Sequence, residues 1–288
     1  MQKTLFQGVC TALVTPFING EVNYPMMEQL LRRQLDAGIK AVVLAGTTGE
    51  APTLTDEEKL ELFRRAKKFT GDDCIILAGT GFNSTTHTIE FSKSAQDEGV
   101  DGLLVVSPYY NKATPEGLFA HYLAVAHSVR IPLILYNVPS RTGVDIPLSV
   151  YQRLAPIPNI VGVKEASSNI AKVTKICGSC QNFDVWTGND DHIVPAISIG
   201  AQGVISVLSN IAPVEAQAMA MAALDGDLDT AAALQQQLQP LIDLLFCEVN
   251  PIPVKAAMKY LGYDCGNCRL PLTELSSENQ KRLKAYFN

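Results

Sequence analysis

Lys164 is the residue whose surroundings most strongly indicate chemistry. It follows Ile160-Val161-Gly162-Val163, a run typical of a strand that is buried on both faces. Lysine side chains are seldom buried unless a partner or a reaction uses them. A desolvated lysine amine gives up its proton more readily and can attack a carbonyl carbon to form an imine. The alternative is that the strand ends at Lys164 and that its ammonium group lies in solvent.

Hydroxyl and guanidinium groups elsewhere could support this chemistry. Thr47, Tyr110 and Tyr136 each carry a hydroxyl that donates and accepts hydrogen bonds, as a proton relay requires. Arg141 could bind a carboxylate bidentately. Gly46-Thr47-Thr48-Gly49-Glu50 could present backbone N–H groups to a carboxylate, and it lacks the lysine and the spacing of nucleotide-binding loops. The alternatives are structural: helix-capping threonines, packed tyrosines and a surface arginine in an ion pair.

Short apolar runs alternate with helix-like stretches over most of the chain. Eight such strand–helix units follow one another, and they suit right-handed parallel crossovers. Eight is the number that closes a TIM barrel, and a doubly wound sheet is the second possibility. The expected strands are Val9–Pro16, Ala41–Ala45, Cys74–Gly79, Leu103–Val106, Leu133–Pro139, Ile160–Ala166, Phe183–Gly188 and Gly203–Leu208.

Helical periodicity predicts helices between these strands and three more at the end of the chain. Those between strands are expected at Tyr24–Ala37, Thr55–Thr70, Ser84–Glu98, Pro115–Ser128, Leu148–Leu154, Ile170–Cys177 and Pro213–Leu224. The last three are expected at Leu228–Phe246, Pro253–Leu261 and Glu278–Tyr286. Residues 1–225 are therefore expected to form a catalytic (β/α)8 barrel, an α/β fold, and residues 226–288 a C-terminal three-helix appendage.

The unusual polar residues gather where the expected strands end. Active sites of TIM barrels lie at the carboxyl ends of their strands, so this asymmetry places a site there. The residues concerned are Thr47 and Thr48 after the second strand, Tyr109 and Tyr110 after the fourth, Tyr136 and Arg141 at the fifth, Lys164 at the sixth and Gly188 after the seventh.

Composition limits the partners. The 288 residues are 47% hydrophobic and 18% charged, which supplies a core and excludes disorder. The net charge of −6 argues against nucleic acid or an anionic membrane. No run approaches the roughly 18 apolar residues of a membrane span, and no signal peptide is visible, so a cytoplasmic enzyme is expected.

Two cysteine pairs have the spacing of metal or redox motifs. They are Cys177/Cys180 and Cys265/Cys268, within a total of seven cysteines. The pairs lie too far apart in the sequence for a zinc ribbon, and neither follows a thioredoxin-like pattern. No metal is expected, and the role of the pairs stays open.

Four motifs, in this order, resemble the dihydrodipicolinate synthase family of the class I pyruvate aldolase superfamily, to which N-acetylneuraminate lyase also belongs. They are Gly46–Glu50, Ser107–Asn111, Tyr136–Gly143 and Gly162–Ala166. The resemblance runs from about Gly8 to the C-terminus and includes Gly203–Ser206 and Asn250–Lys255. It implies condensation of pyruvate with L-aspartate 4-semialdehyde to 4-hydroxy-tetrahydrodipicolinate, on the diaminopimelate route to lysine.

The resemblance also implies roles for the catalytic residues. Lys164 would form the Schiff base with pyruvate, so no separate cofactor is implied. Tyr136 would relay protons beside the imine while hydrogen-bonded to Thr47. Tyr110 would complete the relay in the active site of a neighbouring subunit, within a homotetramer built from two tight dimers.

The substrate-binding residues follow from the same resemblance. Thr48, with nearby backbone amides, would hold the pyruvate carboxylate, and Arg141 would receive the carboxylate of the semialdehyde. The backbone carbonyls of Gly188 and Ile205 would line the pocket.

Two other functions remain possible from the residues. One is a related pyruvate-dependent lyase of a sugar acid, such as an N-acetylneuraminate or 2-keto-3-deoxy-sugar-acid aldolase. Its second substrate carries no carboxylate at the position of Arg141, and a buried guanidinium would then lack a partner. The other is a non-catalytic binding barrel, which would have no need of an imine-forming Lys164.

The resemblance finally bears on feedback inhibition. Lysine-inhibited members carry two histidines in the helix after the glycine-rich motif and a glutamate early in the next helix. The matching positions here are Asp56, Lys59 and His87, whereas Asn83 and Tyr109 fit the effector site. Weak or absent inhibition by L-lysine is therefore expected.

Overall fold

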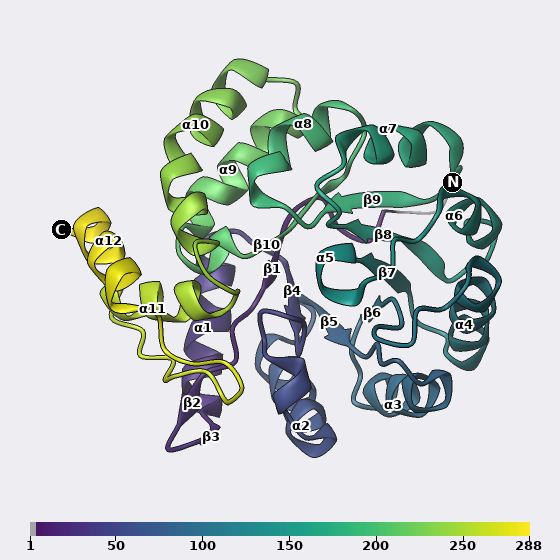
Figure 1. The fold of residues 1–288 in the computed structure, drawn as a ribbon, viewed down its shortest axis with the longest axis horizontal. Helices are drawn as coiled ribbons and strands as arrows, with labels where there is room; N and C mark the ends of the chain where they lie inside the picture. The colour runs from purple at the N-terminus through teal and green to yellow at the C-terminus, as the bar shows by residue number, and fades with distance from the viewer. Residues whose placement is uncertain (1–3) are drawn as a thin grey trace.

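Eight parallel strands close into a barrel in the computed structural model, which describes residues 4–288 (Figure 1). Around the barrel they follow the order β1-β10-β9-β8-β7-β6-β5-β4, so the predicted TIM barrel is confirmed. The strands are β1 Gly8–Ala12, β4 Ala41–Leu44, β5 Ile75–Gly79, β6 Gly102–Val106, β7 Leu133–Asn137, β8 Ile160–Glu165, β9 Asp184–Thr187 and β10 Gly203–Ser206. Their almost purely apolar sequences follow from burial on both faces.

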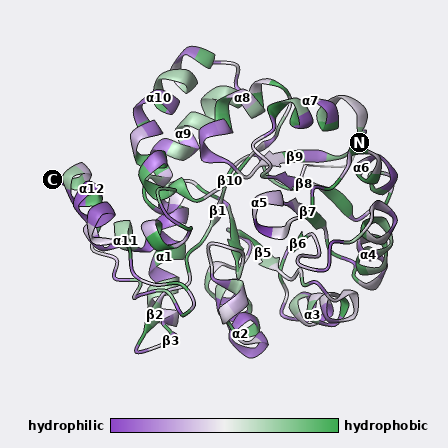
Figure 2. Ribbon diagram, in the orientation of Figure 1, coloured by the Kyte–Doolittle hydropathy of each residue, from purple (hydrophilic) through white to green (hydrophobic). Residues whose placement is uncertain are grey.

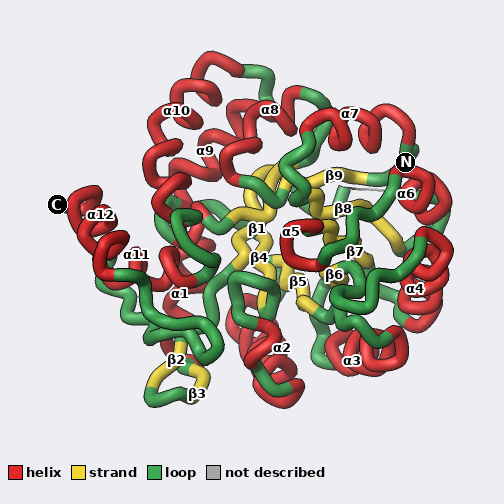
Figure 3. The backbone as a smooth tube through the Cα atoms, viewed as in Figure 1, coloured by secondary structure: helices red, strands yellow, loops and turns green. Residues whose placement is uncertain are grey.

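Helices surround the barrel, and Figure 3 shows them as a red ring outside the yellow strands. The helices of the barrel are α1 Tyr24–Asp36, α2 Asp56–Thr70, α3 Thr85–Asp97, α4 Pro115–Ser128, α5 Pro139–Thr142, α6 Leu148–Leu154, α7 Ile170–Ser179, α8 Ile193–Ser198 and α9 Pro213–Leu224. Short 3-10 helices are η1 Ala51–Thr53, η2 Asp190–His192 and η3 Leu208–Asn210. The predicted capping box that starts α2 is present between Thr55 and Glu58.

Three further helices follow α9, as predicted. They are α10 Leu228–Leu245, α11 Ile252–Tyr260 and α12 Ser277–Phe287. They lie on one side of the barrel, where α10 packs against α9 (Figure 1). None of the helices within residues 4–288 combines the length and the apolar character needed to cross a membrane.

Apolar side chains form two separate layers. The outer layer lies between strands and helices, and helices such as α2 and α4 carry both polar and apolar residues (Figure 2). The inner layer fills the barrel lumen. Near the amino ends of the strands, the Phe6 ring stacks on the Trp186 ring with their centroids 4.7 Å apart. The lumen residues are Phe6, Cys10, Ala12, Ala41, Val43, Leu77, Leu104, Ile134, Tyr136, Val138, Val161, Trp186 and Ile205.

Several expectations about local structure are wrong. The first strand ends at Ala12 rather than Pro16, and a hairpin of β2 Phe17–Ile18 and β3 Glu21–Val22 follows it. The turn is Asn19-Gly20, with φ of 53° and 83°, which is a strong hairpin signal in the sequence. The short helices α5 and α8 were not expected either, because four and six residues that each include a proline show no clear helical period. The expected strands Leu133–Pro139 and Gly203–Leu208 accordingly end earlier, at Asn137 and Ser206, and α5 and η3 follow them.

Candidate active site

Lys164 and Tyr136 lie side by side at the carboxyl ends of β8 and β7. Their Cα atoms are partners in the parallel ladder, and both side chains point into the lumen. Lys164 is only 6% exposed, so the interpretation of this lysine as solvated is wrong. Its Nζ lies 4.5 Å from the centroid of the Tyr136 ring, an attractive arrangement for an ammonium group. The barrel therefore holds a lysine amine against a phenol in a largely apolar chamber.

Gly188 and Ile205 lie on the other side of the Lys164 side chain. A Cβ atom at position 188 would lie 2.8 Å from Lys164 Cε and 2.7 Å from Ala166 Cβ. Glycine at this position therefore leaves the space that the lysine chain occupies. Ile205 is fully buried in β10 and belongs to the lumen layer that contains Tyr136.

Thr47 belongs to the loop that follows β4. Its Oγ1 lies 3.5 Å from the Tyr136 hydroxyl, and either oxygen can donate. The loop turns sharply at Ala45, whose φ is +50°. The carbonyl oxygen of Ala45 occupies the space of a side chain at Gly79, since a Cβ there would lie 2.1 Å from that oxygen. Close backbone approach over β5 thus places Thr47 beside the tyrosine.

A cavity of about 340 Å³ opens at this end of the barrel. Its walls are mostly apolar, and three of the predicted site residues, Thr47, Tyr136 and Arg141, line it. Such a volume suits small organic substrates, and its few polar groups could orient them. Its remaining walls include Leu104, Val106, Tyr109, Val138, Thr142, Asn250, Pro271 and Leu272.

Asn250 is a residue of this site that the sequence did not reveal. Its side-chain NH2 group donates to the Thr48 hydroxyl at 3.0 Å, and its backbone carbonyl accepts from Arg141 Nη2 at 3.2 Å. Its Oδ1 is buried without a hydrogen-bond partner among the described residues. The segment before α11 therefore joins the two residues that were predicted to bind carboxylates. The motif Asn250-Pro251 was the available signal, although it carried no assigned role.

Tyr110 is not brought to the lysine within one chain. It is 90% exposed, with a φ of +73° in the loop between β6 and α4. A tyrosine so exposed makes few contacts with the rest of its own chain. Its predicted role in a neighbouring active site thus stays a prediction.

The cysteines do not form a cluster with other metal ligands. Within residues 4–288, no three His, Cys, Asp or Glu side chains lie close enough to hold a metal ion, and all seven cysteines are free thiols. Burial raises the pKa of Cys177 to about 11 and those of Cys265 and Cys268 to about 12. These thiols are therefore protonated at neutral pH, the form with low reactivity.

Known proteins resemble this chain in both sequence and structure over nearly its whole length. The model of the Dihydrodipicolinate synthetase family matches residues 5–288. A 4-hydroxy-tetrahydrodipicolinate synthase from Kosmotoga olearia is 47% identical over 284 residues, which are 97% of each chain. The crystal structure of dihydrodipicolinate synthase from Thermotoga maritima is 38% identical with a TM-score of 0.96, over 98% of this chain and 97% of that one. The crystal structure of the lysine-bound enzyme from Cyanidioschyzon merolae is 39% identical with a TM-score of 0.95, over 98% of this chain and 97% of that one.

Proposed function

This chain belongs to the dihydrodipicolinate synthetase family and works as a 4-hydroxy-tetrahydrodipicolinate synthase, and we propose that it does so through an imine between pyruvate and Lys164. The observation that carries this mechanism is the buried Lys164 amine beside the Tyr136 ring at the active end of the barrel. The imine itself supplies the electron sink, so the proposal includes no separate cofactor. A cytoplasmic location belongs to the same proposal.

The reaction begins with attack of the Lys164 amine on the ketone carbon of pyruvate, and loss of water gives the imine. The protonated imine withdraws electrons from the adjacent methyl carbon, which loses a proton and becomes nucleophilic. That carbon attacks the aldehyde carbon of L-aspartate 4-semialdehyde and forms the new C–C bond. The amino group of the semialdehyde then attacks the imine carbon, which closes the ring and releases Lys164.

Tyr136 and Thr47 are proposed to move the protons in these steps. Their oxygens lie 3.5 Å apart, within reach of a hydrogen bond that tightens when substrate binds. Tyr110 is proposed to extend this relay from the tight-dimer partner in a homotetramer. Its 90% exposure supports that role, because an exposed tyrosine can enter another subunit.

The two substrate carboxylates are assigned to different groups. Thr48 is proposed to hold the pyruvate carboxylate, because its hydroxyl accepts from Asn250 and keeps its own hydrogen to donate. Arg141 is proposed to bind the semialdehyde carboxylate from the wall of the cavity. The carbonyls of Gly188 and Ile205 are proposed to line the pyruvate pocket.

The choice of aldehyde tests this function. We expect rapid pyruvate consumption with L-aspartate 4-semialdehyde, and rates lower by about a hundredfold or more with N-acetylmannosamine or glyceraldehyde, which offer Arg141 no carboxylate. The measurement is pyruvate loss in parallel assays at equal aldehyde concentration. Equal or faster consumption with N-acetylmannosamine would identify a sugar-acid lyase instead.

L-lysine is expected to inhibit weakly or not at all. The Lys59 ammonium is buried, lies 3.2 Å from Asp56 Oδ1 and sits 4.7 Å from the centroid of the Phe82 ring. His87 Nε2 lies 2.8 Å from the other oxygen of Asp56, so this carboxylate already has two partners. A second ammonium group in this region would meet the charge of Lys59. Initial rates at increasing L-lysine test this, and half-maximal inhibition well below a millimolar would contradict it.

Residues 226–288 are proposed to serve as a region distinct from the barrel of residues 1–225, with a part in assembly. This region also supports the site, because Lys255 in α11 forms an ion pair with Glu50 of the glycine-rich loop at 2.8 Å. Both side chains are almost completely buried. The C-terminal helices thus fix the loop that carries Thr47 and Thr48.

A further inference from the structure

Glu165 lies one residue beyond Lys164, on the opposite face of β8. In the parallel ladder it pairs with Asn137, just as Lys164 pairs with Tyr136. Successive residues of a strand point to opposite faces. Lys164 and Tyr136 therefore point into the lumen, whereas Glu165 and Asn137 point toward α6 and α7. Both are buried, Glu165 at 2% exposure and Asn137 at 0%.

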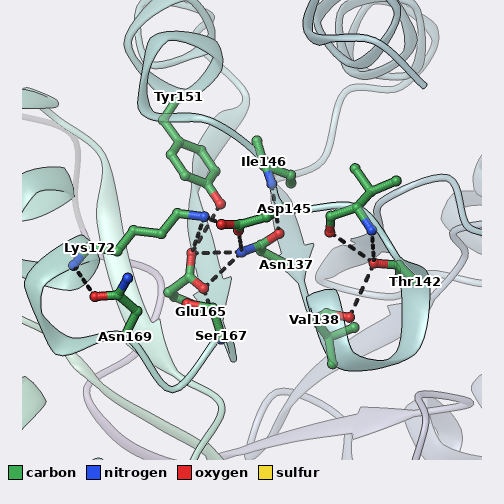
Figure 4. Close-up of polar contacts among 11 residues, drawn as sticks. Asn137, Val138, Thr142, Asp145, Ile146, Tyr151, Glu165, Ser167, Asn169 and Lys172 are labelled. Atoms are coloured by element: carbon green, nitrogen blue, oxygen red, sulfur yellow. Dashed lines mark hydrogen bonds and ion pairs between the residues drawn. The ribbon is translucent and has the colours of Figure 1, made fainter. Parts of the chain in front are cut away.

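The Glu165 carboxylate accepts hydrogen bonds from three groups. Asn137 Nδ2 donates to Oε1 at 2.8 Å and lies 3.1 Å from Oε2. The Tyr151 hydroxyl donates to Oε2 at 3.1 Å, and the backbone N–H of Ser167 donates to Oε1 at 3.0 Å. The Lys172 ammonium lies 3.6 Å from Oε2 and also pairs with Asp145 (Figure 4). A buried carboxylate with this many partners is firmly held.

Glu165 sets the orientation of the Asn137 amide. An ionised carboxylate only accepts hydrogen bonds, so the NH2 end of Asn137 faces it and the carbonyl end faces away. That carbonyl accepts from the backbone N–H of Ile146 at 3.0 Å. The NH2 end also donates to Asp145 Oδ1 at 2.8 Å. Asn137 thereby ties residues 145 and 146 to the end of β7 (Figure 4).

The segment tied in this way carries Arg141. Residues 138–146 leave β7, form the short helix α5 and return toward β7 at Ile146. This segment, here called the arginine loop, pairs with no strand among residues 4–288. Its internal bonds run through Thr142, whose hydroxyl bonds with Val138 and Val144. Asn137 connects this loop to β7, and the Asp145–Lys172 ion pair connects it to α7. These contacts therefore help to determine the position of Arg141.

We propose that Glu165 is a positioning residue that, by orienting Asn137, holds the arginine loop and so sets the affinity for the aldehyde substrate. This inference rests on the proposed function, in which Arg141 binds the carboxylate of the semialdehyde. The position of Lys164 depends less on the hydrogen bonds of Glu165, because β8 is hydrogen-bonded to β7 on one side and to β9 on the other. The network thus acts on the second substrate more than on pyruvate.

The Tyr151 phenol acts as a donor in this network. Burial, followed by the nearby Glu165 charge, raises the pKa of the Tyr151 phenol well above its ordinary value. The phenol therefore keeps its proton and donates it to Glu165. The network contains three neutral donors, the Tyr151 phenol, the Asn137 side-chain amide and the Ser167 backbone N–H, together with the Lys172 cation. These donors suit a carboxylate at position 165, because its oxygens can accept every one of these bonds.

Glu165→Gln tests the proposal by changing charge without changing shape. The new amide nitrogen would face either the Asn137 NH2 group or the Lys172 ammonium, and donor would meet donor. We expect the KM for L-aspartate 4-semialdehyde to rise about tenfold, with the KM for pyruvate changed by less than about twofold. Borohydride trapping of pyruvate on Lys164 should remain at the wild-type level. A role in overall stability alone would move both KM values together or neither.

Lys172→Met is a second test of the network, made at its cation. It removes the ion pairs with Asp145 and Glu165 and should raise the KM for the semialdehyde about threefold, again without an equal change for pyruvate. Arg153→Gln is the matched control, because Arg153 of α6 forms an exposed ion pair with Glu116 of α4, and the substitution should leave both KM values unchanged.

The outcomes separate the two proposals. If the wild-type chain does not condense pyruvate with the semialdehyde, the proposed function and this inference both fall. If the wild-type chain is active and Glu165→Gln leaves the ratio of the two KM values unchanged, this inference alone is overturned. If Glu165→Gln does not fold, the ratio in Lys172→Met decides in the same way.

Discussion

Lys164→Met should abolish turnover, with a loss of at least about a thousandfold in kcat/KM for both substrates. Methionine fills the buried space without straining the lumen, but it has no amine to attack pyruvate. Borohydride reduction in the presence of pyruvate should add the mass of the reduced adduct to the wild-type chain and none to the variant. Intact-mass spectrometry and peptide mapping to residues 160–166 make both measurements.

A matched control distinguishes the loss of the Lys164 amine from the loss of any lysine. Lys175→Met removes an exposed lysine of α7 and should leave trapping and turnover at the wild-type level. Undiminished trapping of pyruvate by Lys164→Met would contradict the proposed mechanism, because the imine would then form on another amine.

Lys255→Met should lower the free energy of unfolding by about 3–5 kcal/mol. The Lys255 ammonium lies 2.8 Å from Glu50 Oε1 and also donates to the carbonyls of Thr15 and Asn267, at 3.1 and 3.2 Å. The side chains of the pair are 2% and 1% exposed, so removal of the lysine strands a buried carboxylate. Urea unfolding, followed by far-ultraviolet circular dichroism, measures the loss.

Two further variants identify the cause. Glu50→Gln in the Lys255→Met background removes the stranded charge and should recover part of the loss. Lys259→Met breaks an exposed pair with Asp264 at 3.9 Å, and its effect should stay below about 1 kcal/mol. A Lys255→Met chain as stable as the Lys259→Met chain would show that the buried pair contributes little.

The barrel could be predicted because each strand is a continuous apolar run and each unit repeats the same order. The position of Lys164 could be predicted for the same reason, since a charge at the end of such a run is conspicuous. The β2–β3 hairpin was missed although Asn19-Gly20 signals it, because its strands are only two residues long. Boundaries of such short elements are set by pairing and not by periodicity.

The residues around Lys164 could be predicted only in part. Thr47 and Tyr136 were expected near the lysine, because both stand at strand ends in the same barrel. Asn250 was not, since it meets Thr48 across 202 positions of sequence, and no local pattern encodes such a contact. Glu165 was visible only as the neighbour of Lys164, because a run buried on both faces does not reveal which side chain faces which layer.

Because side chains alternate along β7 and β8, the two faces of these strands are proposed to serve different substrates. Tyr136 and Lys164 face the chamber where pyruvate is proposed to react, and Asn137 and Glu165 face the layer that is proposed to shape the arginine loop. The outward pair can therefore change in evolution, and with it the accepted aldehyde, while the inward pair keeps its chemistry. The same arrangement constrains the length of β8, because one inserted residue that no bulge absorbs would turn the lysine toward the helices and the glutamate into the chamber.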